Sequence, residues 1–164
     1  MQLVDDENID VAVKVESVFD AGYQLQGIVF SGTVEIEDFM RTEYPDFVRT
    51  EFHHDGQNLY VFASTTAGGF PQARIQVPIA AGPWNGAPLY LRVRRQGNTW
   101  TIFHAFSRDE GNIANDSAWV SLGSFEHEMT LASVGPFVGN AGNAPAHVGR
   151  FDWFQNVLDP VSVE

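Results

Sequence analysis

The sequence predicts an all-β fold, a two-sheet antiparallel β-sandwich, on three observations. Residues 9–17 alternate apolar and polar side chains, which is the two-residue period of a half-buried strand. The 15 Gly and 8 Pro fall mostly between apolar runs and mark turns. Thirteen Phe, four Tyr and four Trp favour strands, and no segment keeps a 3.6-residue period over ten residues. We expect one domain over residues 1–164.

The turn residues divide the chain into short strands joined by hairpins. Asp55-Gly56, Gly68-Gly69 and Gln96-Gly97-Asn98 are the turn signals, and residues 80–88 form a Gly/Pro-rich loop. Residues 34–41 are a helical candidate that also fits a long loop. The predicted strands are residues 9–17, 23–31, 47–54, 59–66, 73–77, 89–95, 99–107, 119–125, 132–138 and 148–157.

The charge and composition of the chain limit the classes of partner and of chemical site that we expect. The net charge of −12 makes nucleic acid and anionic membranes unfavourable partners. The absence of Cys excludes disulfides, thiolate nucleophiles and Cys-based metal sites. No apolar run approaches a membrane-spanning length, and the start Met1-Gln-Leu-Val-Asp-Asp is not a signal peptide. We therefore expect either a cytoplasmic protein or, as the favoured interpretation, a module of a longer chain.

The second half of the chain carries a series of motifs that together resemble those of a known protein family. They are Leu89-Tyr-Leu-Arg-Val-Arg-Arg-Gln-Gly-Asn-Thr-Trp-Thr-Ile-Phe, Phe106-Ser-Arg-Asp with Trp119, Val134-Gly-Pro-Phe-Val-Gly and Arg150-Phe-Asp-Trp-Phe. In their order and spacing they resemble the concanavalin A-like lectin/glucanase superfamily, and more closely the laminin G-like jelly rolls of bacterial extracellular proteins and of some family 43 glycoside hydrolases. Residues 107–119 and 31–46 are longer than the corresponding loops of those domains.

The resemblance implies a jelly roll and a non-catalytic, lectin-like module that binds a polysaccharide, in a bacterial protein outside the cell or in its envelope. Two alternatives stay open. One is a structural or protein-interaction domain of a larger extracellular protein. The other, less favoured, is an enzyme that cleaves polysaccharide as a glycoside hydrolase or a lyase.

Alternation along three predicted strands assigns a polar face. We expect Leu25, Gly27 and Val29 to face the core, with Ile28 outside. The polar side chains of the three strands then share one concave surface. Such a surface can bind a chain of sugars by placing aromatic rings under pyranose rings and polar groups beside hydroxyls. Trp84 in the Gly/Pro-rich loop is the best further candidate for stacking. The predicted carbohydrate-binding residues are Gln24, Gln26, Arg49, Glu51, His53, Trp84, Tyr90, Arg92 and Arg94. The clustered arginines suggest an anionic ligand such as a uronate, although Arg–Glu pairs also complete ordinary solvated sheet faces.

The sequence supports a catalytic site or a metal site less well than it supports a carbohydrate-binding surface. Glu35-Ile-Glu-Asp38 resembles the glucanase carboxylate motif, but Phe39 and Met40 stand where its third carboxylate is needed, so a solvated acidic loop is favoured. His53 and His54 point to opposite faces of a strand, which argues against a shared metal ion. The resemblance also implies a structural Ca²⁺ in an oxygen-rich loop. Its predicted ligands are Asp109, Glu110 and Asp116.

Overall fold

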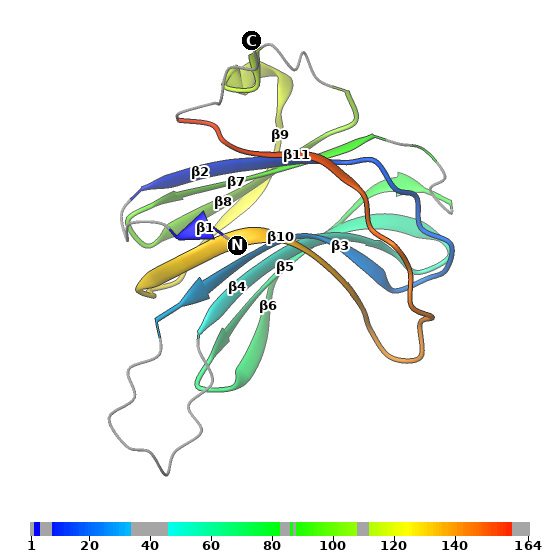
Figure 1. Ribbon diagram of the computed structural model, residues 1–164, viewed down its shortest axis with the longest axis horizontal. Helices are drawn as coiled ribbons and strands as arrows, with labels where there is room; N and C mark the ends of the chain where they lie inside the picture. Colours follow the sequence, from blue (N-terminus) through cyan, green and yellow to red (C-terminus); the bar gives the residue numbers. More distant parts are fainter. Residues whose placement is uncertain are drawn as a thin grey trace.

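The computed structural model shows a sandwich of two packed β-sheets (Figure 1). It describes residues 2–3, 8–33, 46–82, 86, 88–107 and 112–158. The elements, in chain order, are β1 (Gln2–Leu3), β2 (Ile9–Val15), β3 (Gln24–Gly32), β4 (Phe47–His54), β5 (Asn58–Ala67), β6 (Phe70–Ala81), β7 (Leu89–Gln96), β8 (Thr99–Ala105), the short 3-10 helix η2 (Asp116–Ala118), β9 (Val120–Glu126), β10 (Leu131–Asn140) and β11 (Phe151–Asn156).

Every strand pairs antiparallel with its neighbours, which confirms the predicted fold class. The six-stranded sheet has the order β1-β10-β3-β4-β5-β6, and the five-stranded sheet has the order β11-β2-β7-β8-β9. Figure 1 shows the five-stranded sheet as the upper layer and the six-stranded sheet as the lower one. Within the described residues, no helix is long and apolar enough to cross a membrane.

Strand β6 is the element whose length the sequence predicted least well, because it begins at Phe70 and ends at Ala81. It pairs with β5 along its whole length and forms the edge of its sheet. An edge strand tolerates Pro71 and Pro78 because one side of its backbone needs no ladder hydrogen bonds. The prolines therefore do not end the strand. The predicted helical candidate at residues 34–41 lies outside the described residues.

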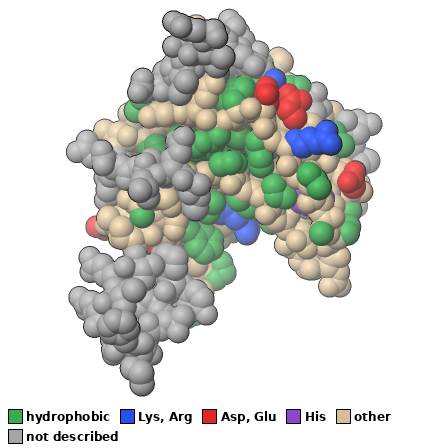
Figure 2. Space-filling model, in the orientation of Figure 1, with side chains coloured by type: hydrophobic (Ala, Val, Ile, Leu, Met, Phe, Trp, Pro, Cys, Tyr) green, Lys and Arg blue, Asp and Glu red, His purple; other side chains and the backbone are tan. Residues whose placement is uncertain are grey.

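The hydrophobic core fills the space between the two sheets. Ile28, Phe30, Val48 and Phe52 contribute from the six-stranded sheet, and Trp100 packs edge-on against Phe30 from the other sheet, with ring centroids 5.0 Å apart. Figure 2 shows hydrophobic side chains gathered in the middle of the visible face, over β10 and β11. Since alternate residues of a strand point to opposite sides, each sheet keeps one face for this core and one outer face.

The predicted orientation of β3 is wrong. Ile28 and Phe30 lie in the core, whereas Leu25, Gly27 and Val29 lie on the other side of the strand. The cause is the pairing register with β4, which sets Ile28 opposite Thr50 and Phe30 opposite Val48. Directly paired residues share a face, so the two large apolar side chains follow Val48 inward.

Candidate functional site

The predicted polar surface is divided between two sheets. Arg49 and Glu51 lie on the outer face of the six-stranded sheet, because they alternate with the core residues Val48 and Phe52. The predicted residues of β7 lie on the outer face of the five-stranded sheet, on the far side of the core; they are Tyr90, Arg92 and Arg94. The expectation that all of these side chains share one surface is therefore wrong.

Two further predicted residues, Gln24 and Gln26, are buried rather than presented outward. The side-chain oxygen of Gln24 accepts hydrogen bonds from the backbone N–H groups of Asp20 and Ala21, at 2.8 and 3.2 Å. Gln26 accepts a hydrogen bond from the hydroxyl of Ser17. These contacts tie the segment after β2 to the start of β3, so the two glutamines have a structural role here. Trp84 lies outside the described residues.

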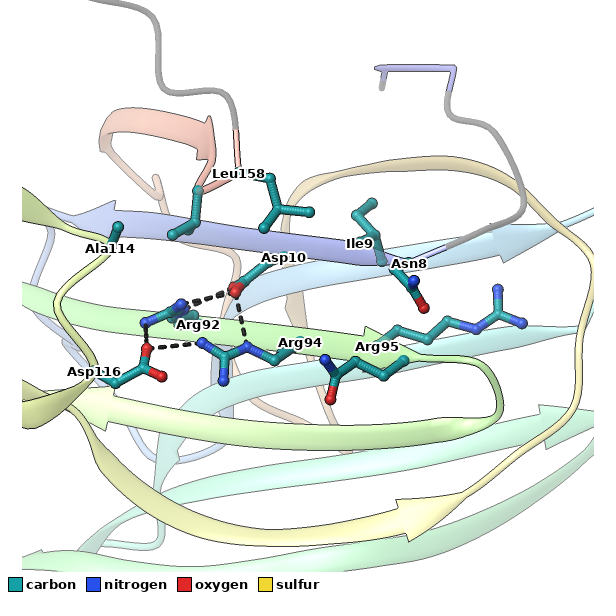
Figure 3. A pocket seen from close by; sticks show the side chains of 11 residues that line it. Asn8, Ile9, Asp10, Arg92, Arg94, Arg95, Ala114, Asp116 and Leu158 are labelled. Atoms are coloured by element: carbon teal, nitrogen blue, oxygen red, sulfur yellow. Dashed lines mark hydrogen bonds and ion pairs between the residues drawn. The ribbon is translucent and has the colours of Figure 1, made fainter.

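A four-residue ion-pair network organises the outer face of the five-stranded sheet (Figure 3). Arg92 holds Asp10 with two hydrogen bonds of 2.7 Å, from Nε and Nη2 to the two carboxylate oxygens. Arg94 donates to the same Asp10 at 2.8 Å. Both guanidinium groups also reach Oδ1 of Asp116, at 2.8 and 2.7 Å. The hydrogen-bonded arginines hold the pKa of Asp116 below its ordinary value, and Asp116 in turn raises the pKa of Arg94.

The network fixes the segment around η2 onto the sheet. Arg92 is only 2% exposed, and its guanidinium carbon lies 5.6 Å from the ring centres of both Phe103 and Trp119. Trp119 is buried, and its Nε1 donates to the carbonyl of Ile113 at 3.0 Å. A second, smaller hydrophobic cluster forms under this segment; it contains Ala12, Tyr90, Ala105, Ile113, Trp119 and Val157. Much of this outer face is thus covered.

A cavity of about 380 Å³ borders the network, lined in part by Asn8, Gln96 and Leu158. Its most polar wall is made of the same arginines and aspartates, whose charges already satisfy one another. A ligand there has to compete with hydrogen bonds of 2.7–2.8 Å. We therefore assign this region to stability.

The predicted calcium ligands do not assemble in the described part of the chain. Asp109 and Glu110 lie outside the described residues. Asp116 faces two guanidinium groups, whose positive charges disfavour a cation at the same carboxylate. The described residues also contain no group of three or more His, Cys, Asp or Glu side chains that could hold a metal ion. Calcium binding elsewhere in the chain stays a prediction.

The outer face of the six-stranded sheet carries an open hollow of about 170 Å³. Its walls come from β3, β4, β5 and β6, from the turn before β3 and from the segment after β10. We call it the six-strand hollow; its lining residues are Tyr23, Leu25, Arg49, Glu51, His53, Phe62, Gln76 and Ala141. It combines aromatic rings, an ion pair and an imidazole on one surface, and three of the predicted binding residues belong to it.

Arg49 and Glu51 form an ion pair at the base of this hollow. Nε of Arg49 lies 2.7 Å from Oε2 of Glu51, whose side chain is 2% exposed. The guanidinium carbon lies 6.0 Å from the ring centre of Phe62 and 5.9 Å from that of Phe137, which approach from the two sides of β4. Two aromatic rings thus fix the position of a cation that remains one-third exposed.

The carboxyl group of Glu51 is unusually hard to ionise. Burial raises the pKa of Glu51 to about 7, and the nearby Arg49 opposes this rise only in part. The carboxyl therefore changes its charge near neutral pH. The net charge of the pair depends on pH in a range where exposed carboxylates are already ionised.

His53 is the centre of an aromatic stack beside the ion pair. Its ring lies 6.1 Å from that of Tyr23 and 5.3 Å from that of Tyr60, with interplanar angles of 19° and 15°. Burial lowers the pKa of His53, so the imidazole is neutral at pH 7. A neutral imidazole offers one donor and one acceptor, which suits a hydroxyl group.

Tyr23 is held in a strained backbone conformation. Its φ of 62° makes it the one residue other than glycine with positive φ in the described part of the chain. Its N–H donates to the carbonyl of His54 at 2.8 Å, and its carbonyl accepts from Ala141 at 2.9 Å. These bonds maintain a conformation that is unfavourable for a bulky side chain, and they leave the phenol ring half exposed over the hollow.

Sequence reasoning missed the aromatic part of this site. Tyr60 and Phe62 pair directly with His53 and Glu51, and the hairpin signal Asp55-Gly56 with simple alternation could have located both. Tyr23 gave no such signal, because its orientation depends on tertiary hydrogen bonds.

Comparison with known proteins supports the fold. No family model matches the chain, and no curated protein matches it. Among solved structures, the chain is similar to the GH43 protein BlXynB from Bacillus licheniformis, with a TM-score of 0.63, 17% identity and 92% of this chain covered. It is also similar to a xylan beta-1,4-xylosidase from Bacillus halodurans, with a TM-score of 0.55, 17% identity and 91% coverage.

The chain spans 27% of each of these two Bacillus proteins. A functionally unknown protein from Saccharomyces cerevisiae is similar over 81% of this chain and 60% of its own length, with a TM-score of 0.53 and 12% identity. These identities show a shared fold. The two-sheet sandwich agrees with the jelly-roll resemblance, while the laminin G-like assignment stays a prediction.

The ion-pair network generates a prediction about stability. We expect Asp10→Asn to lower the free energy of unfolding by about 3 kcal/mol, because it removes the buried carboxylate partner of Arg92 and leaves only the exposed Asp116. Asp152→Asn is the control, since it removes an exposed partner of Lys14 and should cost under about 1 kcal/mol. Urea unfolding at pH 7 measures both. Equal losses in the two variants would contradict the structural role of the network.

The raised pKa of Glu51 predicts a pH dependence of stability. The folded protein holds this proton up to about pH 7, whereas the unfolded chain releases it near 4.5, so ionisation opposes folding as the pH rises between these values. We expect Glu51→Gln to gain stability relative to wild type by about 3 kcal/mol between pH 4 and pH 8. Urea unfolding across this range measures the gain. The exposed Glu128→Gln serves as the control, and a parallel response of both variants contradicts the assignment.

Proposed function

We propose that this chain is a non-catalytic carbohydrate-binding module, and that it binds its ligand in the six-strand hollow. The supporting observation is that an exposed aromatic ring, a partly exposed guanidinium and a neutral imidazole line one open hollow; they belong to Tyr23, Arg49 and His53. Nε of Arg49 and Oε2 of Glu51 lie 2.7 Å apart and pair with each other, whereas the buried Nδ1 of His53 has no hydrogen-bond partner among the described residues.

The hydroxyl groups of a sugar both donate and accept hydrogen bonds, so they suit the guanidinium of Arg49 and the imidazole of His53. The exposed ring of Tyr23 supplies an apolar platform for the faces of a pyranose ring. The combination of a platform with directed polar groups is what orients a ligand in a small site.

The structural neighbours agree with a carbohydrate ligand. Two of them are a GH43 protein and a xylan beta-1,4-xylosidase, and the chain corresponds to about a quarter of each. A module of that size attached to a longer, extracellular protein fits binding that assists another activity. Modest affinity at one shallow site is then sufficient, because attachment raises the effective concentration of the ligand.

The number of carboxyl groups in the six-strand hollow favours binding of a sugar over its cleavage. The usual hydrolysis of a glycosidic bond requires a pair of carboxyl groups. Among the described lining residues of the six-strand hollow, Glu51 is the one carboxyl group. The pKa of Glu51, about 7, suits a proton donor near neutral pH, so assays of reducing-sugar release should accompany the binding experiments.

Affinity electrophoresis against xylan and a panel of neutral and acidic plant and bacterial polysaccharides tests the proposal. We expect at least one polysaccharide to retard the wild-type protein. Tyr23→Ala should weaken binding about tenfold, because a lost ring contact is worth about 1.4 kcal/mol. Phe106→Ala removes a partly exposed ring next to β8 of the other sheet and should have no effect. Failure of every polysaccharide to retard the wild type would refute the function.

A further inference from the structure

The environment of Arg49 indicates which sugar the six-strand hollow accepts. Its guanidinium contacts the rings of Phe62 and Phe137, and its Nε faces Glu51. Among the described residues, the ion pair through Nε with Glu51 is the polar contact that the structure shows for Arg49, and its two terminal nitrogens take no part in it. Because the side chain is one-third exposed, these nitrogens are accessible from the hollow that Arg49 lines.

The geometry favours a planar anion over a neutral group. Two rings approach the guanidinium from opposite sides of β4 and limit its movement, so a fixed fork of N–H donors faces the ligand. Such a fork matches the two coplanar oxygens of a carboxylate, which accept two parallel hydrogen bonds. A hydroxyl group uses only part of this donor capacity.

We propose that the six-strand hollow selects a sugar that carries a carboxylate, a hexuronate unit within a polysaccharide, and that Arg49 binds the carboxylate group. The proposal rests on the carbohydrate-binding function and specifies its ligand. The hollow of about 170 Å³ is smaller than common drug-sized pockets and suits one such unit.

The neighbouring surface provides room for the next unit of the chain. A shallow depression beside Tyr23 is bordered by Gly22 and by residues 141–145, and it shares Tyr23 and Ala141 with the hollow. The ring of Tyr23 therefore stands between two adjoining concavities. A polysaccharide can place its uronate at Arg49 and continue past Tyr23 toward Pro145.

The ionisation of Glu51 makes this recognition sensitive to pH. Below pH 7 the carboxyl of Glu51 is neutral and leaves the charge of Arg49 available to an anion; above pH 7 it competes with the ligand. Arg49 and His53 share its face of β4, and the neighbouring strand β5 contributes Tyr60. From β3, the residues on this face are Leu25, Gly27 and Val29, none of which titrates.

Calorimetric titration with two matched pairs of probes tests the proposal. The first pair is a xylo-oligosaccharide that carries a single glucuronate and the same xylo-oligosaccharide without it. The second pair is oligogalacturonate and its methyl ester. At pH 6 we expect at least one acidic probe to bind at least tenfold more tightly than its neutral counterpart. Arg49→Gln should abolish this preference and keep the weaker neutral binding. The control Arg150→Gln, at an exposed position, should retain it.

The pH dependence provides a second readout. The preference of wild type for the acidic probe should fall about tenfold from pH 6 to pH 8, as one proton on Glu51 is lost. Glu51→Gln should keep the full preference at pH 8, because its side chain stays neutral.

Three results would overturn the proposal: equal binding of acidic and neutral probes, an undiminished preference in Arg49→Gln, or stronger binding of a sulfated oligosaccharide. Equal binding leaves the carbohydrate-binding function in place. No binding of any oligosaccharide removes the function as well, so the two failures are distinguishable.

Discussion

Close packing of two sheets against one shared core is the constraint on which the rest of this structure depends. Each strand must direct one set of alternate side chains into that core, so its other set faces outward. As a result, Arg49 and Arg92 lie on opposite outer faces although both belong to polar sets that look alike in the sequence. The two faces then satisfy their charges in different ways.

On the five-stranded sheet, ion pairs hold a loop segment over the outer face and cover it. Asp10 and Arg92 match each other with two short hydrogen bonds, and Asp116 brings the segment around η2 over the sheet. On the six-stranded sheet, Arg49 pairs through Nε with the buried Glu51, and the rest of its guanidinium remains partly exposed beside the open hollow. Fully satisfied polar groups stabilise a fold, whereas incompletely satisfied ones beside an open hollow are available to a ligand.

The sequence predicted the fold class and the ten main strands because turn residues and alternation are local signals. It did not predict how strands combine, since the pairing of β2 with β7 depends on contacts across about 80 residues of chain. In β3, the alternating glutamines suggested a polar outer face, but burial of Ile28 and Phe30 decided the orientation. For the site, the sequence identified Arg49, Glu51 and His53 and missed the aromatic stack around them.

The central claim is that the outer face of the six-stranded sheet is the binding face. Nuclear magnetic resonance of the isotopically labelled protein, titrated with whichever oligosaccharide binds it, tests this directly. The account predicts that amide shift changes concentrate on β4 and β5 and around Tyr23, while the amides of β7 and η2 stay unchanged. Shift changes centred on Arg92, Arg94 and Asp116 would place the ligand on the opposite sheet and contradict the account.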